Sequence, residues 1–174
     1  MHHLPNIISF LRILLVAPIV WALLNHRYDL AVVLFVIAGI SDGVDGYLAK
    51  RFGWESRFSG VLDAIADKLL LVSTFIVLWL LAVFPLWLVA LIILRDLLIV
   101  GGGVIYNLKI EKFNAEPSLM SKLNTVLQIV LATVGVLSLG LLKISPVVID
   151  LLSWAVAITV VLSGLGYANT WGRR

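Results

Sequence analysis

The sequence predicts an all-α integral membrane protein with six membrane-spanning helices and both termini in the cytoplasm. The first observation is composition: among 174 residues, 61% are hydrophobic and only 13% are charged, and the mean hydropathy is +1.09. A typical globular domain has about 45–50% apolar and about 25% charged residues. Such an apolar chain would expose too much hydrophobic surface to water, which excludes a soluble enzyme, a disordered protein and a DNA-binding module. Because the sequence has no cysteine, disulfides and cysteine-ligated metals are excluded as well.

The second observation is the length of the apolar stretches. A membrane-spanning helix needs about 20 predominantly apolar residues. The chain has six such stretches, and the predicted spans are 7–24, 30–49, 60–83, 86–106, 119–142 and 146–168. We expect the first to be a span rather than a secretory signal peptide, because no Lys or Arg precedes it, Arg12 interrupts it and no clear cleavage site follows it. No stretch is left for a soluble domain, so residues 1–174 are predicted to form a single membrane domain.

Each boundary between the spans has a physical reason. Polar and charged residues separate the first three spans, at 25–27 and at 50–57. Pro85, which has no backbone N–H to donate, separates the third span from the fourth. The polar run 107–118 and the segment 143–146, which begins with a lysine and ends with a proline, separate the last three.

Positive charge in the short connections sets the predicted orientation. Cytoplasmic loops of membrane proteins carry an excess of Lys and Arg. With six spans, both termini and the second and fourth connections lie on one side, which holds seven Lys and Arg residues against two on the other side. The seven are Lys50, Arg51, Arg57, Lys109, Lys112, Arg173 and Arg174, and the two are Arg27 and Lys143. This asymmetry predicts a cytoplasmic location for both termini.

Four aspartates lie within the predicted spans near their cytoplasmic ends: Asp42 and Asp45 in the second span, Asp63 and Asp67 in the third. A single Asp at the centre of a spanning helix costs about 2.5–3.5 kcal/mol. Spacings of i,i+3 and i,i+4 place each pair on one face of its helix, and two consecutive antiparallel helices bring all four to a similar depth. Four carboxylates match the charge of two divalent cations, and all-oxygen ligation favours Mg²⁺ or Mn²⁺. Paired metal ions are a recurrent device for in-line phosphoryl displacement.

A structural interpretation competes with the metal site, namely salt bridges from these acids to Arg12, Lys50 and Lys68. Salt bridges would explain a single aspartate in a span well, but they explain less well four aspartates with this spacing in so apolar a chain. A fifth acid, Asp96, directly follows Arg95 in the fourth span. An internal Arg–Asp pair explains that acid as well as a catalytic role does.

Small residues and bases accompany the first aspartate pair. Gly46 and Ala49 are i,i+3 on one helix, so a backbone or a ligand can approach closely there. Lys50 and Arg51 then offer positive charge to phosphate. Helix packing alone could explain the small residues, but it does not explain the acids. The combination favours a phosphate ester bridged through metal.

This stretch resembles the signature of the CDP-alcohol phosphatidyltransferase family. The signature is Asp, two residues, Asp-Gly, two residues, Ala-Arg, eight residues, Gly, three residues, Asp, three residues, Asp. The chain departs from it at Lys50, in the Arg position, and at Ser59, in the Gly position. Lysine keeps the charge but loses the bidentate phosphate contact, for which Arg51 could compensate. The matching positions are Asp42, Asp45, Gly46, Ala49, Asp63 and Asp67.

The resemblance implies a reaction and a site. The four aspartates would ligate two Mg²⁺ or Mn²⁺ ions that bridge the diphosphate of CDP-diacylglycerol. Asp67 would also take the proton from the acceptor hydroxyl, after which the alkoxide attacks the lipid-side phosphorus and CMP leaves. The residues implied for the cytidine and phosphate pocket are Asn6, Gly46, Ala49, Lys50 and Ser59.

The same resemblance implies a glycerol-type acceptor. Arg95-Asp96 and the segment 117–125 look more like the eukaryotic-type cardiolipin synthase branch of the family. The phosphatidylglycerophosphate synthase branch usually has Arg-Glu at the position of Arg95-Asp96. The preferred acceptor is therefore phosphatidylglycerol, and glycerol 3-phosphate is the alternative. Both are anionic, so the predicted acceptor-binding residues are Arg12, Arg95 and Lys122.

A cation transporter or proton relay is the alternative from another class, because it also uses acids within the membrane. Transporters place ion sites near the midplane and often contain internal repeats, whereas these acids cluster at one end and the two halves of the sequence show no repeat. We therefore expect an enzyme of the bacterial inner membrane with its active site facing the cytoplasm. The resemblance also allows a homodimer, and no nucleic-acid partner is expected.

Overall fold

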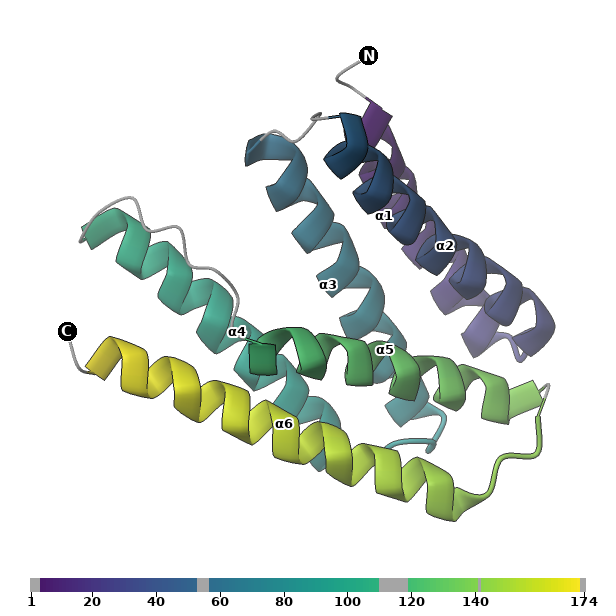
Figure 1. Cartoon of the computed structure of the whole chain (residues 1–174). Helices are drawn as coiled ribbons and strands as arrows, with labels where there is room; N and C mark the ends of the chain where they lie inside the picture. Colours follow the sequence, from purple (N-terminus) through teal and green to yellow (C-terminus); the bar gives the residue numbers. More distant parts are fainter. Residues whose placement is uncertain (1–3, 53–56, 110–118, 141, 173–174) are drawn as a thin grey trace.

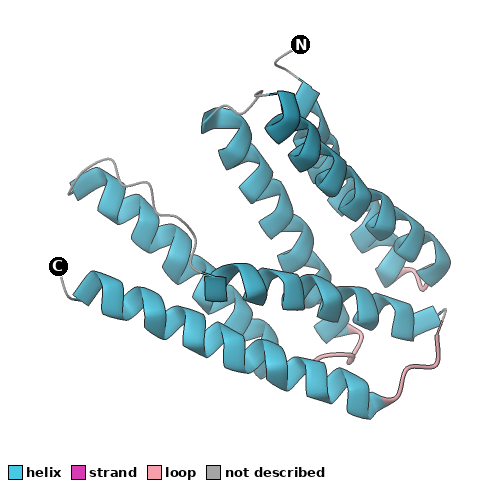
Figure 2. Cartoon of the chain, viewed as in Figure 1, coloured by secondary structure: helices cyan, strands magenta, loops and turns pink. Residues whose placement is uncertain are grey.

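The computed structural model describes residues 4–52, 57–109, 119–140 and 142–172, and among these it describes the side chains of 7–41, 62–99, 119–140 and 142–164. Within these ranges the chain forms six α-helices, and Figures 1 and 2 draw no strand there. The helices are α1 (Leu4–Leu24), α2 (Tyr28–Phe52), α3 (Arg57–Leu80), α4 (Leu86–Lys109), α5 (Leu119–Gly140) and α6 (Pro146–Gly172). One helix lies in each predicted span, so the predicted all-α fold is confirmed.

The third helix ends earlier than predicted, at Leu80 rather than at residue 83. The reason is Ala82, whose φ of 57° is in the left-handed region. There the backbone N–H of Val83 donates to the carbonyl of Leu78 at 2.8 Å, which closes the helix with a Schellman-type end. His26, which also has a φ of 57°, follows the end of α1. In contrast, α2, α4 and α6 continue past the predicted spans, because polar residues at their ends sustain a helix after the apolar stretch has ended.

α3 packs against α1, α4 and α5, and among the described helices it and α5 each contact three others. α1 also packs against α2, and α5 also packs against α2 and α6. Figure 1 shows that α5 and α6 run in opposite directions across the other helices. The apolar core between the helices includes fully buried Ile19, Phe75, Leu78 and Leu131.

The helix ends alternate between two sides of the bundle. In Figure 1 the starts of α1 and α3 and the ends of α2, α4 and α6 lie toward the top and left. The turns that follow α1 and α3 lie toward the lower right, as does the end of α5. This alternation is the one that six consecutive spans require.

Three stretches of the described residues are long and apolar enough to cross a membrane: Ile7–Leu24, Leu119–Gly140 and Pro146–Gly164. The outer surface of the bundle is also apolar, as shown by Leu97, Leu151 and Trp154, whose exposed fractions are 65%, 72% and 62%. Side chains of this kind are stable when lipid rather than water covers them. The four aspartates and Arg95 fall in α2, α3 and α4, and the crossing of the membrane by these three helices stays a prediction.

Gly135 on α5 lies against the ring of Phe84, which packs on Phe75 with ring centroids 5.4 Å apart. A Cβ added at Gly135 would lie 2.7 Å from Cζ of Phe84 and 3.0 Å from Cδ1 of Leu78. We expect Gly135→Ala to overpack this contact and to lower the free energy of unfolding by about 1–3 kcal/mol. Thermal unfolding in detergent micelles measures the effect. Gly164→Ala is the control, because a Cβ there meets nothing within 4 Å; equal midpoints for the two variants would contradict the prediction.

Candidate active site

The carboxylates of Asp63 and Asp67 converge on one buried cation, the guanidinium of Arg12. Arg12 lies on α1 with an exposed fraction of 1%. Its Nη1 donates to Oδ1 of Asp63 at 2.9 Å and also to Oδ1 of Asp67. The Ser9 hydroxyl, nearly one turn earlier on α1, donates to the same oxygen of Asp63 at 3.3 Å. The two aspartates therefore share one face of α3, as their i,i+4 spacing predicts.

The two carboxylates of this cluster are partly exposed, whereas their shared partner is buried. Two carboxylates against one guanidinium leave a net charge of −1 on these three groups. The side chains of Asp63 and Asp67 are 37% and 38% exposed, whereas that of Arg12 is fully buried. Arg12 therefore neutralises the carboxylates from inside the bundle, and their outer sides stay accessible.

The donor set suits a divalent metal ion. Carboxylate oxygens are the ligands that Mg²⁺ and Mn²⁺ prefer. The pairing of Asp63 and Asp67 with Arg12 is the salt bridge that the competing structural interpretation predicts, and it is present. Among the described residues, no group of three or more His, Asp or Glu is placed to hold a metal ion. The side chains of Asp42 and Asp45, the other two predicted ligands, lie outside the described part of the structure.

The residues predicted to bind the donor also have undescribed side chains, so their roles stay predictions. They are Asn6 in α1, Gly46, Ala49 and Lys50 in α2, and Ser59 in α3. The backbone of α2 is nevertheless described through all of its predicted site positions. Asp42 lies three residues after Gly39, which is about 4.5 Å further along the helix axis.

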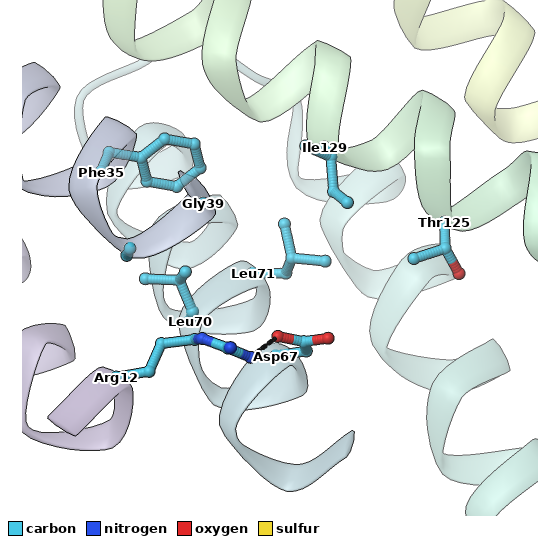
Figure 3. A pocket seen from close by; sticks show the side chains of 9 residues that line it. Arg12, Phe35, Gly39, Asp67, Leu70, Leu71, Thr125 and Ile129 are labelled. Carbon is cyan, nitrogen blue, oxygen red and sulfur yellow. Dashed lines mark hydrogen bonds and ion pairs between the residues drawn. The ribbon is translucent and has the colours of Figure 1, made fainter. Parts of the chain in front are cut away.

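A pocket lined by α1, α2, α3 and α5 lies beside the carboxylate cluster. Figure 3 shows Arg12 and Asp67 together at one end of it, with apolar side chains above them. Phe35 and Gly39 line it from α2, and Ile129 lines it from α5. The part of α2 that precedes Asp42 therefore faces the same space as Asp67.

A second polar cluster is buried where α3, α4, α5 and α6 meet. Arg95 and Asp96 on α4 are only 5% and 6% exposed, and Nη1 of Arg95 donates to Oδ1 of Asp96 at 2.9 Å. Nη2 of Arg95 donates to the hydroxyl oxygens of Ser121 at 2.7 Å and Ser163 at 2.8 Å. Nζ of Lys68 forms an ion pair with Oδ2 of Asp96 at 2.5 Å. The internal Arg–Asp pair considered from the sequence is therefore present, and four helices contribute to it.

The three predicted acceptor-binding residues do not come together in one place. Arg12 belongs to the carboxylate cluster on α1 and α3, and Arg95 belongs to the buried cluster of α4. Lys122 on α5 is exposed. The two clusters are nevertheless neighbours along α3, because Asp67 belongs to the first and Lys68 to the second. The acceptor role of all three residues stays a prediction.

Two residues of the buried cluster were missed from the sequence. Ser163 was not singled out, and Lys68 was named only as a candidate partner of the four aspartates, whereas its partner is Asp96. The signal available for Ser163 was weak: a serine in an apolar helix usually bonds its own backbone. Its contact with Arg95 joins residues 68 positions apart, and no local pattern encodes that.

We expect Ser163→Ala to destabilise the protein, because it removes a hydrogen-bond acceptor from the buried guanidinium of Arg95. Hydrogen bonds to charged groups contribute about 1.5–3 kcal/mol, so a loss of this size in the free energy of unfolding is predicted. Ser138→Ala is the matched control, since that hydroxyl donates to the carbonyl of Gly135 on its own helix. Thermal unfolding in detergent compares them, and equal losses would refute the assignment.

The chain is similar to known proteins over most of its length. A family model described as CDP-alcohol phosphatidyltransferase matches residues 2–165. The rice chloroplastic CDP-diacylglycerol–glycerol-3-phosphate 3-phosphatidyltransferase 1 is 33% identical over 183 residues, covering 95% of this chain and 56% of that protein. The probable cardiolipin synthase (CMP-forming) of Drosophila melanogaster is 35% identical over 153 residues, covering 79% and 47%. The CDP-diacylglycerol–glycerol-3-phosphate 3-phosphatidyltransferase of Bacillus subtilis is 30% identical over 188 residues, covering 98% and 96%.

The chain thus spans about half the length of the rice and fruit-fly relatives and nearly all of the Bacillus relative. Its apolar helices and its relatives support an integral membrane protein. The family that the aspartate signature resembles is the family whose model covers almost the whole chain. The chain belongs to the CDP-alcohol phosphatidyltransferase family.

Proposed function

We propose that this protein transfers the phosphatidyl group of CDP-diacylglycerol to a glycerol-type alcohol and releases CMP. The observation that carries the proposal is the convergence of Asp63 and Asp67 on one cationic partner beside a pocket. Phosphoryl transfer needs positive charge where negative charge develops on the attacking and the leaving oxygen, and metal ions held by these carboxylates would supply it. The family match supports the same reaction.

Asp63 and Asp67 would hold divalent metal ions together with Asp42 and Asp45, whose helix faces the same pocket through Gly39. When bound, Mg²⁺ or Mn²⁺ would offset the charge of the diphosphate and of the reacting oxygens. Arg12 pairs with one oxygen of each α3 carboxylate, and of the two aspartates Asp67 lines the pocket. Asn6, Gly46, Ala49, Lys50 and Ser59 would contact the cytidine and phosphates of the donor.

Asp67 is the proposed general base. Its carboxylate lines the pocket and is partly exposed, so an acceptor hydroxyl can reach it. The proton moves from that hydroxyl to the Asp67 carboxylate, and the acceptor oxygen forms a bond to the lipid-side phosphorus. The bond from this phosphorus to the oxygen of CMP breaks, and CMP leaves with the electron pair.

The preferred acceptor is phosphatidylglycerol, which would give cardiolipin. The buried cluster of Arg95, Asp96 and Lys68 carries one excess positive charge, which suits the single negative charge of a phosphodiester. Glycerol 3-phosphate, a dianion, is the second candidate. It is favoured by the Bacillus subtilis relative, a CDP-diacylglycerol–glycerol-3-phosphate 3-phosphatidyltransferase that the chain matches over nearly its full length. Lys122 would serve either acceptor near the membrane surface.

The proposed topology has all six helices crossing the bacterial inner membrane, with both termini and the aspartates on the cytoplasmic side. The alternation of the helix ends supports it, as does the seven-to-two distribution of Lys and Arg. The family match favours the enzyme over the transporter considered from the sequence. Proteoliposomes supplied with CDP-diacylglycerol and both acceptors separate the classes, because an enzyme releases CMP whereas a transporter moves ions without it.

We expect turnover to require a divalent cation and both α3 carboxylates. Excess chelator should abolish CMP release, and added Mg²⁺ or Mn²⁺ should restore it. Asp67→Asn should lower kcat by about 10²–10⁴, the typical contribution of a general base, while sparing the binding of CDP-diacylglycerol. Asp150→Asn on α6 is the control, because that aspartate is exposed. Full turnover in chelator would refute the metal site, and full turnover of Asp67→Asn would refute the base.

An assay that compares candidate acceptors identifies the true one. Purified protein is supplied with CDP-diacylglycerol, either Mg²⁺ or Mn²⁺, and one acceptor at a time. Phosphatidylglycerol should give cardiolipin, and glycerol 3-phosphate should be a poor substrate, with the lipid products identified by mass. If glycerol 3-phosphate readily gives phosphatidylglycerophosphate while phosphatidylglycerol gives no cardiolipin, the preferred acceptor is wrong and the second candidate stands.

A further inference from the structure

One nitrogen atom of Arg12 lies at the point where the two carboxylates of α3 converge. This atom, Nη1, donates to Oδ1 of Asp63 at 2.9 Å and also to Oδ1 of Asp67, and Figure 3 draws the contact with Asp67. A divalent cation that bridges two carboxylates likewise binds an oxygen of each. A positively charged group of the protein itself therefore takes the position of a cation shared by Asp63 and Asp67.

The charge of Arg12 is held inside the bundle. Its side chain is fully buried, whereas those of Asp63 and Asp67 are 37% and 38% exposed. Separating a buried ion from its partners is strongly destabilising, because the charge is then left without compensation. Arg12 therefore stays beside the two carboxylates whether or not a metal ion binds them.

This fixed charge has two opposite effects on the site. Two carboxylates at i,i+4 on one helix repel each other, and the guanidinium between them offsets that repulsion. The pair is therefore held together without any metal ion. When a divalent cation binds, however, the guanidinium competes with it for the same Oδ1 oxygens and repels it from a few ångströms away.

We propose that Arg12 is a resident counter-cation of the aspartate site, which positions Asp63 and Asp67 in the absence of metal and lowers the affinity of the site for divalent cations. The inference rests on the metal site of the proposed phosphatidyl transfer. Arg12 acts through the two carboxylates, so it is a positioning residue. The salt bridge and the metal site are then two states of the same carboxylates. This role is distinct from the acceptor binding that the sequence predicts for Arg12.

The test removes the charge of Arg12 and keeps a hydrogen-bond donor in its place. Binding of Mn²⁺ to the purified protein in detergent is measured from the electron paramagnetic resonance signal of the free ion. Arg12→Gln should bind Mn²⁺ at least about tenfold more tightly than the wild-type protein, because the neighbouring positive charge is gone. Its thermal unfolding midpoint without metal should fall, because the two carboxylates lose their counter-charge.

Two further variants separate this role from a structural one. Arg12→Lys keeps the charge, so it should bind Mn²⁺ as the wild-type protein does, whereas a merely structural role predicts weaker binding in both Arg12 variants. Arg27→Gln also removes one positive charge, but Arg27 is exposed and follows the end of α1. Leu24, the last residue of α1, is already about 18 Å from Arg12 along the helix axis, beyond the Debye length of about 10 Å at 0.1 M salt. Arg27→Gln should therefore leave the Mn²⁺ affinity unchanged.

Unchanged or weaker Mn²⁺ binding by Arg12→Gln overturns the inference, as does equal tightening by Arg27→Gln. A second measurement does not need Arg12→Gln to fold. In the wild-type protein with ¹³C-labelled arginine, addition of Mg²⁺ should shift a guanidinium band in the infrared difference spectrum, because the metal ion takes carboxylate oxygens from Arg12. The shifted band should be missing in Arg12→Lys. No such shift in a protein that binds Mn²⁺ also overturns the inference.

The outcomes separate this inference from the proposed function. Tighter Mn²⁺ binding by Arg12→Gln, together with no release of CMP by the wild-type protein, would support the inference and contradict phosphatidyl transfer. Metal-dependent release of CMP, together with equal Mn²⁺ affinities of the wild-type protein and Arg12→Gln, would do the reverse. If neither protein binds Mn²⁺, the cluster is a salt bridge alone, and both the metal site and the inference are overturned.

Discussion

The buried guanidinium of Arg12 is the constraint on which the site depends. An ionised side chain withdrawn from water costs several kcal/mol unless it is paired and hydrogen-bonded. Arg12 meets this requirement only where α1 lies against the face of α3 that carries Asp63 and Asp67. The pairing therefore fixes how α1 and α3 pack and which way both carboxylates point. Both carboxylates are partly exposed, by 37% and 38%.

The charges continue along α3 into a second group of contacts. Asp67 turns toward α1, while its neighbour Lys68 turns toward Asp96 on α4. Asp96 in turn holds Arg95, whose guanidinium reaches Ser121 and Ser163 on the last two helices. α3 thus links the proposed chemical step to the part of the bundle proposed for the acceptor.

The protein reverses the usual distribution of polarity. Large apolar side chains cover its surface, whereas the interior contains buried Asn124 and Gln128 as well as the charged clusters. The hydroxyl of Thr159 on α6 donates to Oδ1 of Asn124 at 3.0 Å, which ties α6 to α5 by a polar contact. Lipid tails are as apolar as leucine, so hydrophobic burial gives little preference between lipid and core. Polar contacts and close packing, such as that of Gly135 on Phe84, then determine which helix faces meet.

The sequence by itself determined the helices, their approximate bounds, the family, and the shared face of Asp63 and Asp67, because each of these depends on local spacing. It missed the early end of α3, since nothing in the apolar run marks Ala82 as a left-handed residue. Only the tertiary structure decided that Arg12 pairs with the α3 carboxylates, that Arg95 belongs to a separate buried cluster, and that a pocket opens at Gly39. The physical reason is that a helix apolar on all sides carries no signal for which face turns inward, so its neighbours are chosen by contacts between residues far apart in the chain.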